Sequence, residues 1–114
     1  MTVRGTVDPL VGDELIRISL EVYHVHFTFM NSVLQIGAVF SVLVPGQTET
    51  SIDPIAKRGD LTVPWALVGK IVTSVVWDET IRIVFTDQQE IVIRPSRGQS
   101  RGTVIGRDMT IEDF

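Results

Sequence analysis

The amino-acid sequence contains one short β-type pattern twice, and this repeat constrains the fold more than any other feature. The first copy begins at Leu10-Val11-Gly12 and the second at Leu67-Val68-Gly69. In each copy a β-rich run, a short polar break and a second run ending in phenylalanine follow, at Phe29 and at Phe85. A polar turn and a third apolar run complete each copy. We therefore expect pseudo-repeat units at about 10–44 and 67–93, a connector at 45–66 and a C-terminal extension at 94–114.

Apolar and polar residues alternate along these runs, which is the pattern of strands that bury one face. The alternation changes parity over Glu21-Val22, which predicts a tight hairpin there. The third run of the first copy, 33–44, is interpreted as one strand that buries both of its faces. Its first face carries Leu34, Ile36, Ala38, Phe40 and Val42, and its second face carries Val33, Val39 and Leu43.

The turns predict a strand register, because a register must keep apolar residues on one face. A two-residue turn at Asn31-Ser32 pairs Phe29 with Leu34, Phe27 with Ile36, Val25 with Ala38, and Tyr23 with Phe40. A three-residue loop at 87–89 pairs Phe85 with Ile91, and Ile83 with Ile93. A three-residue break at 78–80 pairs Trp77 with Ile81, and Val75 with Ile83.

A single three-stranded meander leaves its apolar face uncovered, so two meanders are expected to cover each other. A chain of 114 residues has the length of one domain. The sequence thus predicts an all-β domain in which two tandem three-stranded antiparallel meanders form a sandwich or a partly open barrel. We also expect 49–52 to extend a sheet, 65–67 to form a helical turn and 103–105 to form a last short strand. The simplest role for the large side chains is in the core, with an interface as the alternative: Tyr23, Phe40, Trp65 and Trp77.

The overall composition argues against several classes of protein. The net charge of −4 and the pI of about 5.0 disfavour a nucleic-acid binder, which needs a basic surface. The chain has no cysteine, so it has no disulfides and no thiolate metal sites. The longest apolar run is too short to span a membrane, and no secretory hydrophobic region follows Met1. We expect a cytoplasmic protein without a cofactor.

The second copy resembles a family of small bacterial all-β domains of unknown function. The matching residues are Leu67-Val68-Gly69-Lys70-Ile71-Val72 and Ile83-Val84-Phe85-Thr86-Asp87, and the match covers mainly 67–93. Gln88 stands where the family has a glycine. The resemblance implies a fold but no activity and no catalytic residue. Many small bacterial domains of this kind neutralise toxins, so the resemblance also points to a toxin-neutralising role.

His24 and His26 are spaced as metal ligands could be, since residues i and i+2 of a strand point the same way. They are the only histidines, and a catalytic zinc site needs a third protein ligand, which the sequence does not indicate. A solvent-facing pair beside an apolar strand is therefore favoured over a metal site. The adjacent carboxylates of the chain are interpreted as turn residues, and no catalytic motif is present.

Four of the ten basic residues fall close together, with no acidic residue between Glu90 and Asp108: Arg94, Arg97, Arg101 and Arg107. Arginine binds carboxylates and phosphates through its planar group. This segment is either an anion-binding or partner-binding edge, or a solvated connector, and the connector is favoured.

The sequence therefore predicts a non-enzymatic interaction module, with an immunity-type inhibitor of a protein partner as its narrower form. An acidic inhibitor would be steered towards a basic enzyme. The first alternative is a ligand-binding barrel or small enzyme that uses His24 and His26 around a cavity. The second is a structural homodimer sealed by an exposed strand edge.

Overall fold

The computed structural model describes residues 10–77, 79–94, 101–106 and 111–113. In chain order, the first half contains β1 (Leu15–Leu20), β2 (Val25–Phe29), β3 (Val33–Ile36), β4 (Phe40–Leu43) and β5 (Thr50–Ile52). A one-turn helix, α1 (Thr62–Trp65), lies in the connector. The second half contains β6 (Val72–Trp77), β7 (Ile81–Phe85), β8 (Glu90–Ile93), β9 (Gly102–Ile105) and β10 (Ile111–Asp113).

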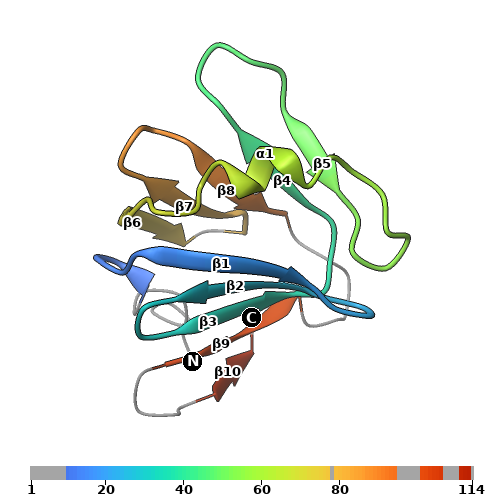
Figure 1. The fold of residues 1–114 in the computed structure, drawn as a ribbon, viewed down its shortest axis with the longest axis horizontal. Helices are drawn as coiled ribbons and strands as arrows, with labels where there is room; N and C mark the ends of the chain where they lie inside the picture. Colours follow the sequence, from blue (N-terminus) through green and yellow to red (C-terminus); the bar gives the residue numbers. More distant parts are fainter. Residues whose placement is uncertain (1–9, 78, 95–100, 107–110, 114) are drawn as a thin grey trace.

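The strands form two antiparallel sheets that pack as the layers of a sandwich (Figure 1). The first sheet has the strand order β1-β2-β3-β9-β10, and the second has the order β5-β4-β8-β7-β6. Both sheets end in edge strands and do not close into a barrel. The expected all-β class and its sandwich form are thus confirmed.

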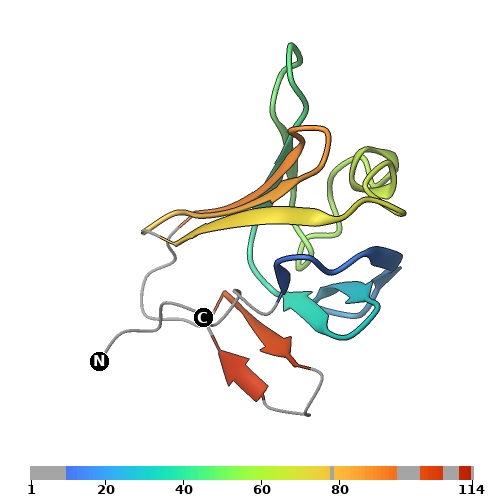
Figure 2. The same ribbon diagram turned by 90° about the vertical axis from the view of Figure 1, so that its left-hand side faces the viewer.

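The two halves of the chain exchange their last hairpins. The meander β1–β3 continues into β4 and β5, and these lie beside β8 in the other sheet. The meander β6–β8 is followed by β9 and β10, which in turn lie beside β3. Figure 2 shows the first crossing, where the chain rises from β3 in one layer to β4 in the other. Each sheet therefore depends on strands from both halves.

The repeated Leu-Val-Gly segments join the two halves through matching hydrogen bonds. The amide of Gly12 donates to the carbonyl oxygen of Val72 at 2.8 Å, and the amide of Gly69 donates to that of Leu15 at 2.7 Å. Both glycines have positive φ, +85° and +92°, which an L side chain adopts only with strain. Leu10 and Leu67, each two residues before one of these glycines, are fully buried. The two copies of the repeat thus form the junction between the sheets through reciprocal hydrogen bonds.

The core fills the space between the two inner faces. Along β2 and β7 every second residue is buried and the residues between them are half-buried, as the alternation predicted. Phe27 of β2 packs edge-on against Phe40 of β4, with ring centroids 5.6 Å apart and planes at 77°. This geometry is favourable between aromatic rings and ties one sheet to the other.

The prediction that 33–44 forms one strand buried on both faces is wrong. The chain leaves the first sheet after Ile36 and enters the second at Phe40, and Val39 between them is 50% exposed. Phe40 and Val42 still point inwards, because the inner faces of both sheets look onto the same core. The alternation shows which face of a strand a residue occupies. It does not show which sheet the strand has joined.

Two predicted registers are wrong by two residues. Phe27 pairs with Leu34 and Val25 with Ile36, so the β2–β3 turn is at 30–31. Likewise Ile83 pairs with Ile91, and the β7–β8 loop is at 86–88 with Gln88 at φ +71°. A shift of two residues keeps every side chain on its face, so apolar matching cannot detect it. The pairs across the 78–80 break are confirmed as predicted.

The smaller elements largely follow the expectations. The segment 49–52 contributes β5, and 103–105 lies within β9, whereas β10 was not expected. The helical turn begins at Thr62, three residues before the predicted 65–67. Phe40 is buried, but Tyr23 and Trp65 are each 61% exposed, so their predicted place in the core is wrong. Within the part of the chain described, no helix is long and apolar enough to cross a membrane.

Candidate functional site

The hairpin turn between β1 and β2 presents apolar side chains to solvent. The amide of Glu21 donates to the carbonyl oxygen of His24 at 2.8 Å, which closes a two-residue turn at Val22-Tyr23. Val22 is 64% exposed and Tyr23 is 61% exposed. Hairpin turns usually carry glycine, asparagine or aspartate, because these residues suit the turn backbone and water. A valine and a tyrosine are unusual in such a turn, and the needs of folding alone do not explain them.

A second loop, 53–59, is braced by its own aspartate. The Asp53 carboxylate accepts hydrogen bonds from the amides of Ile55 and Ala56 at 3.1 and 3.0 Å, and its backbone pairs with that of Arg58. Lys57 lies in the left-handed region at φ +55°, which is uncommon for a residue with a side chain. Ile55 is 59% exposed. The loop is therefore held in a defined shape that displays an isoleucine.

Lys57 joins the loop to the turn. Its ammonium group donates to the carbonyl oxygen of Val22 at 3.0 Å and lies 5.7 Å from the centre of the Tyr23 ring. Contacts of this kind are worth about 0.5–1 kcal/mol at exposed sites. We use the name Tyr23 surface for the exposed residues of the turn, the adjoining end of β1 and the loop that Lys57 joins to the turn: Leu20, Val22, Tyr23, Ile55 and Lys57.

A small pocket lies beside the Tyr23 surface. Its volume is about 30 Å³, which is the space of one water molecule. Small-molecule sites usually offer roughly 300–1,000 Å³. This pocket is therefore only a small depression in the surface and is too small to hold a metabolite. Its lining comes from β1, β5, the loop and the residue before α1: Leu20, Ile52, Asp53, Pro54, Lys57, Arg58, Gly59 and Leu61.

The two histidines lie next to the turn on the outer face of the first sheet. His24 is exposed and His26 is half-buried, with ring centroids 6.0 Å apart. Burial lowers the pKa of His26 below its usual value, and His24 adds to the lowering, whereas Glu21 opposes it. Among the described residues, no three His, Asp or Glu side chains are placed together as metal ligands.

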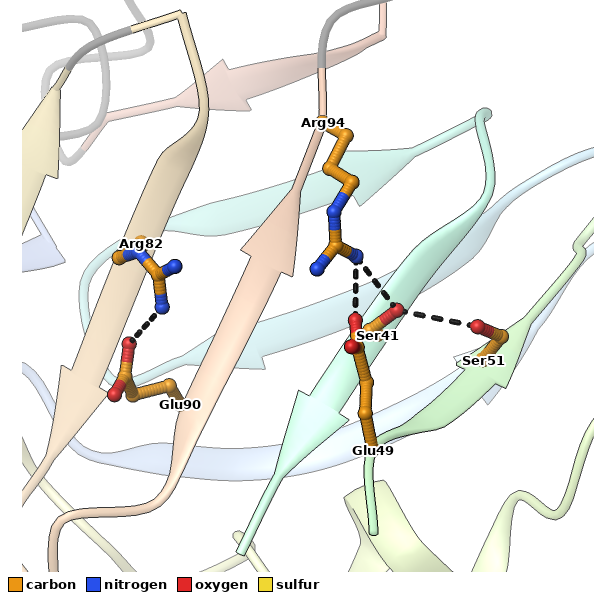
Figure 3. A network of polar contacts seen from close by, with 6 residues as sticks. All are labelled: Ser41, Glu49, Ser51, Arg82, Glu90 and Arg94. Carbon is orange, nitrogen blue, oxygen red and sulfur yellow. Dashed lines mark hydrogen bonds and ion pairs between the residues drawn. The ribbon is translucent and has the colours of Figure 1, made fainter.

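The two described arginines of the predicted anion-binding segment, Arg94 and Arg101, have different partners and do not form one cluster. Arg94 lies on the outer face of the second sheet, bound to the Glu49 carboxylate and, at 3.3 Å, to the Ser41 hydroxyl (Figure 3). The hydrogen bond from Arg94 is the main reason why the pKa of Glu49 is lowered. Arg101 donates to the carbonyl oxygen of Glu79 at 2.8 Å. Arg97 and Arg107 lie outside the described residues.

Figure 3 shows two separate sets of polar contacts on the outer face of the second sheet. Arg82 and Glu90 form an ion pair of 3.1 Å across neighbouring strands. Ser41 is 1% exposed on this face, and its hydroxyl lies 3.3 Å from that of Ser51. Each charge in these contacts has a partner, so the contacts stabilise the sheet and leave little free charge for an anion.

Comparison of the chain with protein-family models, curated proteins and solved structures gives no match. The resemblance of 67–93 to a bacterial domain family therefore gains no support from a family model. The candidate site rests on the geometry of the chain alone.

Sequence reasoning missed the Tyr23 surface because its two loops are 30 residues apart in the chain and their contact is tertiary. One signal was available, namely the apolar Val22-Tyr23, which forms the turn one residue after the hairpin predicted at Glu21-Val22. Ile55, between Asp53-Pro54 and Lys57, is a second apolar residue in a turn-rich segment.

Proposed function

We propose that the protein is a non-enzymatic interaction module that binds a protein partner through the Tyr23 surface. The observation that carries the proposal is the exposure of Val22, Tyr23 and Ile55 on two braced loops that Lys57 links. Loops held by a rigid scaffold are common sites of binding.

The composition of the Tyr23 surface fits a binding surface for a protein. Tyrosine is enriched among the residues that dominate binding energy, and it loses little conformational entropy when it is already held in place. Tyr23 is held by Lys57, and its ring remains mostly accessible. A partner that covers the ring and the Ile55 side chain would gain apolar burial at a small ordering cost.

The narrower form of the proposal is an immunity-type inhibitor of an enzyme. The chain is small and carries a net charge of −4, which would speed association with a basic partner. This form requires the partner to be an enzyme whose activity falls when the complex forms. It is tested by assaying the partner's activity with and without the protein.

The two alternatives, a ligand-binding protein and a structural homodimer, predict different properties of the chain. A ligand-binding protein needs a cavity, and the pocket that described residues form beside the Tyr23 surface, of about 30 Å³, is too small for a metabolite. A structural homodimer sealed by an exposed strand edge would have twice the mass of one chain in solution.

The test begins with capture of partners from native lysate, followed by measurement of Kd with the purified partner. We expect Tyr23→Ala and Ile55→Ala each to weaken binding by about tenfold or more, as at other interface hot spots. Met30→Ala is the matched control, since Met30 is 63% exposed but lies at the opposite end of β2. Equal affinity for all variants would contradict the proposal, as would a protein that captures nothing and stays monomeric.

A further inference from the structure

We propose that two copies of this chain bind each other by exchanging halves, so that β1–β5 of one copy fold with β6–β10 of the other. The interaction surface is the one that already joins the two halves within a single chain. The partner that fits it is a second copy of the same chain, because that copy carries the same complementary half.

The two halves are built as two copies of one unit. Strands β1 to β5 have 6, 5, 4, 4 and 3 residues, and β6 to β10 have the same lengths in the same order. The first strand of each half is interrupted at the same place, between Leu15 and Arg17 in β1 and between Val72 and Ser74 in β6. Each half therefore offers the other the same set of strands.

The strand pairings that join the halves match residue for residue. Phe40, the first residue of β4, lies opposite Ile93, the last residue of β8. In the same way Gly102, the first residue of β9, lies opposite Ile36, the last residue of β3. Reciprocal contacts of this kind are typical of the interface between two identical subunits. The halves of this chain thus bind each other as the subunits of a dimer do.

Neither half completes a sheet with its own strands. Among the described residues, β4 and β5 pair with each other and with β8, and neither pairs with β1, β2 or β3. The hairpin β9–β10 likewise joins the sheet of β3. Each half needs a complementary half, and a second chain supplies the same contacts as the first. Exchange of identical elements is for this reason a low-cost route to a dimer.

The chain passes from one half to the other through 60–66, which we call the hinge. The hinge contains α1, a single turn of 4 residues without a side-chain cap, and a helix of this length has little stability of its own. When extended, the hinge spans about 23 Å at roughly 3.3 Å per residue, which reaches a second molecule in contact with the first.

The closed monomer and the exchanged dimer differ mainly in the hinge, so the protein concentration selects between them. Pro64 in the hinge is buried in the closed form, and opening the hinge costs this burial. We therefore expect the monomer to prevail in dilute solution and the dimer to form as the concentration rises.

An exchanged dimer carries two Tyr23 surfaces. Loop 53–59 follows β5 directly and stays with the Val22-Tyr23 turn when the hinge opens, so the Lys57 contact is kept. Two such surfaces bind a partner that repeats its epitope more tightly, since the second contact becomes intramolecular. This consequence rests on the proposed function, whereas the exchange of halves does not.

The experiment uses cysteine pairs as reporters, because the chain has no cysteine of its own. Gln35 and Thr103 lie opposite each other across β3 and β9, on strands from different halves. Opposite residues of antiparallel strands are about 4.5–5.5 Å apart at Cα, which suits a disulfide. Full-length Gln35→Cys and Thr103→Cys variants are mixed in urea, refolded together at about 1 mM, the effective concentration that a short linker gives, and oxidised.

We expect a covalent dimer of the two variants on a non-reducing gel, and much less of it after refolding at micromolar concentration. Gln35→Cys mixed with His26→Cys is the matched control. His26 lies opposite Gln35 within the first half, which stays in one chain in both forms, so this mixture should give no such dimer. Equal amounts of dimer in the two mixtures, or none in either, would overturn the proposal.

The double variant Gln35→Cys/Thr103→Cys, refolded at micromolar concentration, checks that the pair can form. It should close a disulfide within one chain and keep the far-ultraviolet circular dichroism of the wild type. If it does not close, β3 and β9 are not neighbours and the proposal fails. The wild type refolded at about 1 mM should also contain a species of twice the monomer mass by light scattering. Such a species without the cross-link between Gln35→Cys and Thr103→Cys would be a dimer joined at a strand edge, which would overturn the exchange of halves.

Discussion

Lys70, just before β6, and Asp87, in the β7–β8 loop, form an ion pair of 2.7 Å. The matching positions in the first half of the chain are joined by a different polar contact. There Asp13 precedes β1 as Lys70 precedes β6, and it accepts hydrogen bonds from the backbone and side chain of Asn31 at 3.1 Å each. The acidic residue thus precedes the first strand of the meander in the first half, and lies in the turn between the second and third strands in the second half. Both contacts tie the start of a meander to the turn between its second and third strands.

The pair predicts a pH-dependent contribution to stability. Partial burial opposes ionisation of Asp87, but hydrogen bonds from Lys70 and Gln89 outweigh it and lower the pKa of this carboxyl below 3.8. A lowered carboxyl pKa stabilises the fold above the unfolded pKa, and this stability is lost as pH falls through the folded pKa. Lys70→Met should cost about 0.2–1 kcal/mol near pH 7, since the side chains are 29% and 37% exposed. In urea unfolding, the difference from the wild type should shrink below pH 4, while a difference constant with pH would contradict the assignment.

Asp13 should matter more to stability, because its carboxylate is buried and accepts several hydrogen bonds. It is 5% exposed and binds the Ser32 hydroxyl at 2.9 Å in addition to Asn31. Asp13→Ala removes the acceptor of the buried Ser32 hydroxyl and of two Asn31 donors, and it should cost about 2–3 kcal/mol. Ser32→Ala, which removes one donor, should cost about 1 kcal/mol. Chemical denaturation measures both, and equal losses would show that the carboxylate is not the centre of the contact.

Gly12 and Gly69 should respond alike to substitution, since they occupy matching positions in the two halves. A Cβ atom would meet nothing within 4 Å at either glycine, so the cost is conformational. Alanine should destabilise the fold by about 1–2 kcal/mol at each position, which is the cost of the left-handed backbone for an L-residue. Asparagine, which tolerates this backbone, should cost less. Thermal unfolding of the four variants checks the order, and an alanine variant as stable as the wild type would refute it.

Lys57→Met should loosen the Val22-Tyr23 turn while the sandwich stays intact. Methionine keeps much of the apolar stem but loses the hydrogen bond to Val22 and the charge over the Tyr23 ring. We expect faster amide hydrogen exchange at 22–24 and a loss of no more than about 1 kcal/mol in global stability. Met30→Ala, at the other end of β2, should leave exchange at 22–24 unchanged. If Lys57→Met also leaves it unchanged, Lys57 does not hold the turn.

The strands with strict alternation could be predicted, because the period of two is a local property of the backbone. Phe27 and Ile83 reach the core as expected. The residues that form the candidate site could not be found this way. Burial is the simplest prediction for Tyr23 and Trp65 because large aromatic side chains are usually buried, and alternation does not show where a strand ends.

The sequence by itself determined the all-β class, the two meanders and the faces of their strands, since these follow from side-chain alternation and turn residues. Only the tertiary structure decided the registers across the turns at 30–31 and 86–88, the exchange of β4–β5 and β9–β10 between the sheets, and the contact of Lys57 with Tyr23. The physical reason is that a strand buries the same residues whichever sheet it joins. Its neighbours are selected by packing between segments that lie far apart in the chain.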